Sequence, residues 1–162
     1  MLFGSDDRAM RAVAEAMVEL GEGEATELVA QPTTEAEYME LARRKTGALF
    51  RAAAELGAIA AGADAYTVES FGSYAERVGI AFQIRDDVPD ATPEADTLGK
   101  PTGQDIEMER PSPVQITDLT AAAINARARE ESAAALPSLA AADPGDTEAM
   151  EYLQDLAEFV VV

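Results

Sequence analysis

Three aspartates stand together near the middle of the chain, directly after a stretch with helical periodicity. The apolar residues of that stretch recur every three or four positions: Val68, Phe71, Ala75, Val78 and Phe82. They share one helix face, and the same spacing continues to Asp86 and Asp90, with Asp87 about 100° further round. Carboxylates facing inward repel one another and lose hydration, so they need a counter-charge. A divalent cation such as Mg²⁺, which prefers oxygen ligands, is the predicted partner.

A chance origin is the alternative for this pattern. The chain holds 31 acidic residues against 12 basic ones, and so acidic a chain produces two adjacent acids followed by a third without any site. Spacing alone does not decide between a metal site and a solvated helix end. The apolar stripe in front of the acids is the feature that favours the metal.

The two lysines are the other residues that could do chemistry. Lys45 falls on the apolar stripe of a predicted helix, between Leu41 and Leu49, and is followed by Thr46. Its ammonium either reaches past the apolar surface to water or binds an anion, and the pattern favours neither. Lys100 lies between a glycine and a proline, where a solvated turn is the better local interpretation.

Composition excludes several classes of function. The chain has no cysteine and no histidine, so nucleophilic triads built on those residues and thiolate metal sites are impossible. A net charge of −19 repels nucleic acid and anionic membranes. No apolar run is long enough to span a membrane, and the first residues lack signal-peptide character. Stable membrane insertion is therefore not expected, and a cytoplasmic location is predicted.

The same charge resembles that of proteins from microbes that keep molar salt in the cytoplasm. At about 1 M salt the Debye length is about 3 Å, which screens the self-repulsion. A partly disordered acidic chain is the alternative, but a hydrophobic content of 48% argues against it.

Helices are expected to position these residues, and no convincing strand is found. The first follows Asp6 or Asp7 and reaches about residue 29, with Met10, Val13, Met17 and Leu20 along one face. Thr34 and Glu37 form a capping box for the second, and Asp64 caps the third, which Pro89 ends or kinks. A fourth covers about 119–136, and Thr147 caps the last. The predicted fold is all-α, as one domain of residues 1–162.

Three segments in register resemble the polyprenyl synthetase family, the trans-isoprenyl diphosphate synthases. They are Y-M-E-L-A-R-R-K-T-G-A-L-F at 38–50, V-G-I-A-F-Q-I-R-D-D-V-P-D at 78–90 and L-G-K-P-T-G-Q-D at 98–105. The resemblance implies a helical bundle around a central cavity. It also implies condensation of an allylic diphosphate with isopentenyl diphosphate, through Mg²⁺-assisted loss of pyrophosphate.

The resemblance assigns roles to the same residues. Asp86, Asp87 and Asp90 would form the second aspartate-rich motif and hold Mg²⁺ against the allylic diphosphate. Lys45 and Thr46 would contact the diphosphate or the reacting centre. Gln83 would support that site, and Lys100 would reach the leaving group.

Departures from the family point to a chain that carries only its C-terminal half. Asp6, Asp7 and Arg8 do not supply the family's first aspartate-rich motif, and Pro89 stands where a leucine is usual. The chain is therefore expected to be inactive alone and to act as part of a complete enzyme, as a homodimer or with a complementing subunit. The alternatives are an inactive remnant or accessory subunit that binds partner helices, and a plain acidic helical protein with an accidental motif.

Overall fold

The computed structural model describes residues 7–88 and 121–162, and within these ranges every regular element is a helix. The order is α1 (Asp7–Val29), α2 (Glu35–Ala42), η1 (Arg43–Gly47), α3 (Ala48–Ala60), α4 (Ala65–Asp87), α6 (Ala121–Ala142) and α7 (Thr147–Phe159). The all-α prediction is confirmed. No helix in the described ranges is both long enough and apolar enough to cross a membrane.

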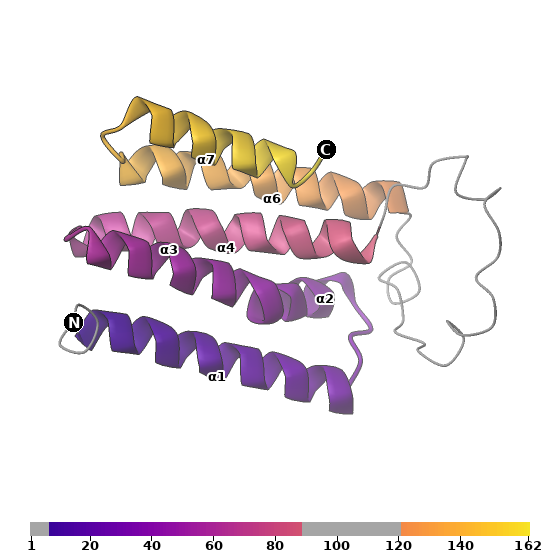
Figure 1. Ribbon diagram of the computed structural model, residues 1–162. Coiled ribbons are helices and arrows are strands. Elements are labelled where there is room, and N and C mark those ends of the chain that lie inside the picture. Colours follow the sequence, from indigo (N-terminus) through magenta and orange to yellow (C-terminus); the bar gives the residue numbers. More distant parts are fainter. Residues whose placement is uncertain (1–6, 89–120) are drawn as a thin grey trace, which may run out of the picture.

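The long helices run almost parallel, side by side, with α4 in the middle (Figure 1). α4 packs against α3 on one side and α6 on the other, while α1 lies against α3 and η1, and α7 packs on α6. Residues of α4 therefore belong to both hydrophobic clusters of the core. One cluster joins Tyr38, Ile84 and Ile124, and the other joins Val78, Leu139 and Ala157. This central helix is the element that ends in the aspartates.

Local hydrogen bonding explains the starts of α2, α4 and α7. The Thr34 side chain accepts from the Glu37 backbone N–H and the Glu37 carboxylate accepts from the Thr34 backbone N–H, which is the predicted capping box. Asp64 caps α4 as predicted. The last helix is capped by Asp146 rather than by Thr147, since the Asp146 carboxylate accepts from the Ala149 backbone N–H.

Helix α1 buries a different face from the one that its large residues predicted. Its buried positions are small: Ala9, Ala12, Ala16 and Gly23. The predicted stripe is exposed instead, with 63% of Met10 and 59% of Met17 accessible. A Cβ atom on Gly23 would lie 3.1 Å from the Arg44 Cβ, so α1 approaches η1 too closely there for a larger residue.

Candidate functional site

The Lys45–Thr46 pair lies in a short π-helical turn, η1, which joins α2 to α3. The backbone N–H of Ala48 donates to the carbonyl of Arg43, five residues earlier. Single π turns inside helices often occur at functional sites. The wider turn also changes the phase of the helix, so Leu49 is 44% exposed instead of continuing the buried stripe through Leu41.

Two glycines let η1 lie directly against α4. A Cβ atom on Gly79 would be 3.0 Å from the Gly47 Cα and 2.9 Å from the Phe50 Cγ. A Cβ on Gly47 would be 3.2 Å from the Glu76 carbonyl oxygen. Glycine at both positions permits this close contact, which brings the Lys45–Thr46 segment alongside the second half of α4.

A hydrogen bond joins the two elements one turn beyond this contact. The Thr46 hydroxyl donates to the Gln83 side-chain oxygen, with 2.5 Å between Oγ1 and Oε1. Gln83 is three and four residues before Asp86 and Asp87, a spacing at which Cβ atoms on a helix are about 5–6 Å apart. The structure therefore brings Thr46, Gln83 and the paired aspartates into one region.

The two adjacent aspartates differ in their surroundings. Asp86 is exposed. Asp87 is half-buried, and its Oδ2 accepts a hydrogen bond of 2.6 Å from the hydroxyl of Tyr38 on α2. Burial raises the pKa of Tyr38 well above its ordinary value, and the hydrogen bond and negative charge of Asp87 add to this shift, as does the charge of Asp86. Asp87 is thus tied to the core, whereas Asp86 is open to ligands.

Lys45 does not extend into an apolar core, because two glutamates of α1 surround its ammonium. Its Nζ lies 2.5 Å from Glu27 Oε2 and 3.5 Å from Glu24 Oε1, and its side chain is 19% exposed. Partial burial alone lowers the pKa of Lys45, but the hydrogen bond and charge of Glu27, with the charge of Glu24, raise it overall. The ammonium is therefore firmly protonated.

The remaining predicted residues, Asp90 and Lys100, lie outside the described residues. Within the described part of the chain, no three acidic side chains are grouped closely enough to hold a metal ion. Asp86 and Asp87 alone could supply carboxylate oxygens to Mg²⁺, which usually takes one or two carboxylates and completes its shell with water and phosphate. The residues present therefore fit a magnesium–diphosphate ligand better than an all-protein metal site.

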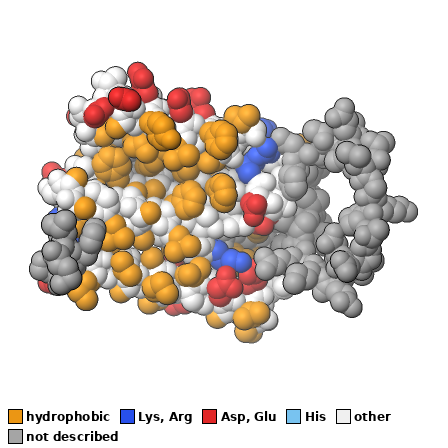
Figure 2. Space-filling model, viewed as in Figure 1, with side chains coloured by type: hydrophobic (Ala, Val, Ile, Leu, Met, Phe, Trp, Pro, Cys, Tyr) orange, Lys and Arg blue, Asp and Glu red, His pale blue; other side chains and the backbone are white. Residues whose placement is uncertain are grey.

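An apolar face adjoins this polar region. The predicted inward stripe of α4 is buried at Val78 and Ala75, but Phe82 is 45% exposed, so the face that ends in Asp86 opens outward. The Phe82 ring lies 5.8 Å from that of Phe50. Figure 2 shows hydrophobic side chains spread over α1, α3 and α7 on the face turned to the viewer.

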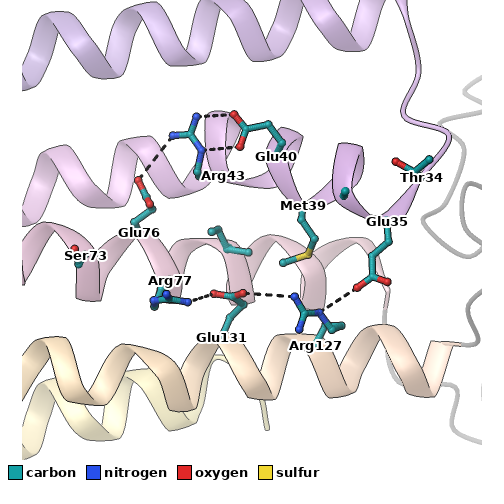
Figure 3. Close-up of a pocket in the computed structure, with 12 residues that line it drawn as sticks. Thr34, Glu35, Met39, Glu40, Arg43, Ser73, Glu76, Arg77, Arg127 and Glu131 are labelled. Carbon is teal, nitrogen blue, oxygen red and sulfur yellow. Dashed lines mark hydrogen bonds and ion pairs between the residues drawn. The ribbon is translucent and has the colours of Figure 1, made fainter.

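A hollow of about 750 Å³ lies between α2, α4 and α6, and none of the predicted site residues lines it. Ion pairs cross it, from Arg77 to Glu131 at 2.9 Å and from Arg127 to Glu35 at 3.1 Å (Figure 3). Each cation there already has a carboxylate partner. The hollow therefore has the character of a structural ion-pair network that ties three helices together.

Sequence reasoning missed three residues of the candidate site: Tyr38, Glu24 and Glu27. Glu27 is 18 residues from its partner Lys45, and Tyr38 is 49 residues from Asp87. No local pattern links residues so far apart. Tyr38 carries one signal of a partner, because the hydroxyl of a buried tyrosine usually finds a hydrogen-bond partner.

Comparisons with known proteins identify the family to which the chain belongs. The family model described as polyprenyl synthetase matches residues 2–156. A geranylgeranyl diphosphate synthase from Cereibacter sphaeroides is 42% identical over 119 residues, which cover 74% of this chain and 39% of that protein. Among solved structures, a polyprenyl synthase from Roseobacter denitrificans has a TM-score of 0.73 and 28% identity, covering 96% of this chain and 63% of that one.

A third similar protein was solved with ligands. It is a polyprenyl synthase from Caulobacter crescentus, complexed with calcium and isoprenyl diphosphate, with a TM-score of 0.71 and 27% identity. The match covers 96% of this chain and 58% of that one. Thus the chain spans about two fifths or less of the length of the first curated relatives. Fold, motif order and the family match agree, and the chain belongs to the polyprenyl synthetase family.

Proposed function

We propose that this chain is part of a prenyltransferase of isoprenoid biosynthesis, which condenses an allylic diphosphate with isopentenyl diphosphate. The observation that carries the proposal is the 2.5 Å hydrogen bond between Thr46 and Gln83. It joins the segment that contains Lys45 to the helix that ends in the paired aspartates. An ammonium, a hydroxyl, an amide and carboxylates in one region suit a diphosphate bound with Mg²⁺.

The charges of the site support a metal-dependent ligand. Acidic groups stand on both elements of the site: Glu24 and Glu27 lie beside the Lys45 ammonium, and Asp86 and Asp87 follow Gln83 on α4. Arg43 and Arg44 on the same turn are already paired with Glu19 and Glu22, so a diphosphate bound beside these carboxylates is expected to need divalent cations. In the proposal, Asp86, Asp87 and Asp90 hold Mg²⁺. The substrate ligands are Lys45, Thr46, Gln83 and Lys100.

The chemistry that follows is electrostatic. When bound, Mg²⁺ neutralises the diphosphate as a leaving group. Lys45 donates N–H groups to the diphosphate oxygens and opposes the negative charge that grows as the allylic C–O bond breaks. The electron pair of that bond leaves with pyrophosphate, a C–C bond forms at the allylic carbon, and the isopentenyl unit loses a proton. The Thr46–Gln83 hydrogen bond holds both side chains in fixed orientations beside the reacting centre.

The apolar face supports a hydrocarbon substrate. Phe82 directly precedes Gln83 in sequence, and its exposed ring contacts that of Phe50. An isoprenoid bound through its diphosphate at the polar region would have apolar surface next to it for its tail, where burial is favourable.

Exposed apolar surface on α1 supports a second candidate function, that of an accessory subunit that binds partner helices without catalysis. Exposed apolar residues extend over α1, including Met10, Val13 and Met17, and contiguous apolar surface of this kind often marks an interaction site. In either role we propose one structural unit of residues 1–162 that carries the second aspartate-rich motif of a longer enzyme. It would work in a salty cytoplasm, as a homodimer or with a complementing chain.

Calorimetry with inorganic pyrophosphate tests the proposed site. In about 2 M KCl, we expect binding only when MgCl₂ is present. Asp86→Asn should weaken that binding about tenfold or more, because it removes an exposed carboxylate ligand. Asp155→Asn, which removes an exposed acid from α7, is the matched control and should leave the affinity unchanged. Absence of any magnesium-dependent heat in the native chain would favour the accessory subunit instead.

A further inference from the structure

Lys45 is one of several cations that η1 directs at α1, and its contacts differ from those of its neighbour. Arg44 meets Glu22 at 2.6 Å, and that glutamate is 56% exposed. Lys45 meets Glu27 at 2.5 Å and also Glu24 at 3.5 Å, and Glu27 is 28% exposed. The Lys45 side chain is 19% exposed and that of Arg44 is 29% exposed, so the lysine is the more enclosed cation and its closest partner is the more enclosed glutamate.

We propose that Glu27 is a positioning residue that holds the Lys45 ammonium ready for the diphosphate. This inference rests on the proposed function. A lysine side chain has many rotamers, and fixing it only when the ligand arrives would weaken binding. Glu27 fixes it beforehand. An ammonium has three N–H donors, so Lys45 can keep its bond to Glu27 and still donate to phosphate oxygens.

The position of Lys45 in the site supports this role. It directly precedes Thr46, whose hydroxyl is bonded to Gln83, so backbone and neighbour are already fixed relative to α4. The close contact of Gly47 with Gly79 holds the other side of the turn. The long Lys45 side chain is the part that could still change conformation, and its ion pair with Glu27 restricts that conformational freedom.

Charge repulsion and positioning of Lys45 predict opposite changes in diphosphate affinity when Glu27 is neutralised, which makes the inference testable. A carboxylate near an anion-binding site repels the anion, so neutralising either Glu22 or Glu27 should strengthen diphosphate binding if only charge matters. If Glu27 positions Lys45, then Glu27→Gln should weaken binding despite removing a negative charge. Glu22→Gln removes the same charge from the same helix and is the matched control.

The experiment is calorimetric titration of the full chain with inorganic pyrophosphate, in MgCl₂ and molar KCl, with folding checked by circular dichroism. We expect Glu27→Gln to weaken binding about 3- to 10-fold. Glu22→Gln should bind at least as tightly as the native chain. Equal or tighter binding by Glu27→Gln would overturn the positioning role. If the native chain binds no pyrophosphate, the proposed function fails and the positioning role fails with it.

Two further measurements test whether Glu27 acts through Lys45. In a Lys45→Met background, Glu27→Gln should cause no additional loss, and an undiminished loss would overturn the inference. The second needs no ligand, because with only two lysines in the chain, ¹³C-methylated lysine signals in NMR are readily assigned. Glu27→Gln should lower the pKa of Lys45, and an unchanged titration would overturn the ion pair on which the inference stands.

Discussion

At the scale of single residues, the adjacent acids Asp86 and Asp87 differ in exposure and in hydrogen bonding. Asp86 is exposed, whereas Asp87 receives the hydroxyl hydrogen bond of Tyr38, a core residue that is 4% exposed. The two positions are about 100° apart on α4, so one faces the opening and the other faces α2. The Tyr38 hydrogen bond therefore fixes the last turn of the helix that presents Asp86.

Tyr38→Phe is predicted to remove this support in a pH-dependent way. Near pH 7.5 it should lower the free energy of unfolding by about 1.5–3 kcal/mol, the range for a lost hydrogen bond to a charged group. Because the folded state raises the pKa of Tyr38, that group's contribution is present below about pH 10 and falls above it, by about 1.4 kcal/mol per pH unit. The difference between the two proteins should therefore shrink above pH 10 in urea titrations. A difference that stays constant between pH 8 and pH 11 would contradict this.

At the scale of elements, the site depends on how closely η1 lies against α4. Gly79→Ala would place a methyl group 3.0 Å from the Gly47 Cα, and backbone cannot move aside as a flexible side chain can. Overpacking of this kind costs about 1–3 kcal/mol, against about 1 kcal/mol gained from better helix propensity. We expect a net loss of up to about 2 kcal/mol in urea unfolding and weaker pyrophosphate binding, since the Thr46–Gln83 bond would lengthen.

Gly57→Ala provides the control for this prediction. Gly57 lies in α3, and an added Cβ there meets no other atom within 4 Å. The substitution should stabilise the protein by about 0.5–1 kcal/mol and leave binding unchanged. If Gly79→Ala behaved as Gly57→Ala does, the close glycine contact would not be what sets the distance between η1 and α4.

Sequence reasoning succeeded where the cause is local. Thr34 and Asp64 cap their helices through backbone groups three residues away, so their roles follow from residue type and spacing. The π turn at η1 and the buried alanine face of α1 could not be found in this way, because contacts between distant helices decide them. Periodicity placed Phe82 and Asp86 on an inward face, yet both are exposed in the structure, and the last turns of α4 instead pack their other side, which includes Ile84, against α2 and α6.

The candidate site was predicted only in part. Family resemblance brought Lys45, Thr46, Gln83 and Asp86 together, and the structure supplies a Thr46–Gln83 hydrogen bond between η1 and α4. The contacts of Glu27 with Lys45 and of Tyr38 with Asp87 are evident only from the structure. An acidic chain offers many glutamates that could meet a lysine, and only the packing of α1 on η1 selects one.

At the scale of the whole molecule, a net charge of −19 predicts that folding depends on salt. Helix α7 shows the problem locally, since its acids recur at helical spacing: Glu148, Glu151, Asp155 and Glu158. Like charges three or four residues apart destabilise a helix by about 0.2–0.5 kcal/mol per pair at low salt. Raising KCl from 0.1 M to about 2 M shrinks the Debye length from about 10 Å to below 3 Å, so thermal unfolding should move to higher temperature.

A charge-reduced variant separates screening of this repulsion from a general effect of salt on apolar surface. The double substitution Glu151→Gln with Asp155→Asn removes two exposed charges from the middle of that row. If repulsion is the cause, the variant should melt higher than the native chain at 0.1 M KCl, and the gap should close at 2 M. If salt acts only by strengthening apolar burial, which both proteins share, then the two melting curves will shift in parallel with salt and the gap will not change. Scanning calorimetry at four or five KCl concentrations would distinguish the two behaviours.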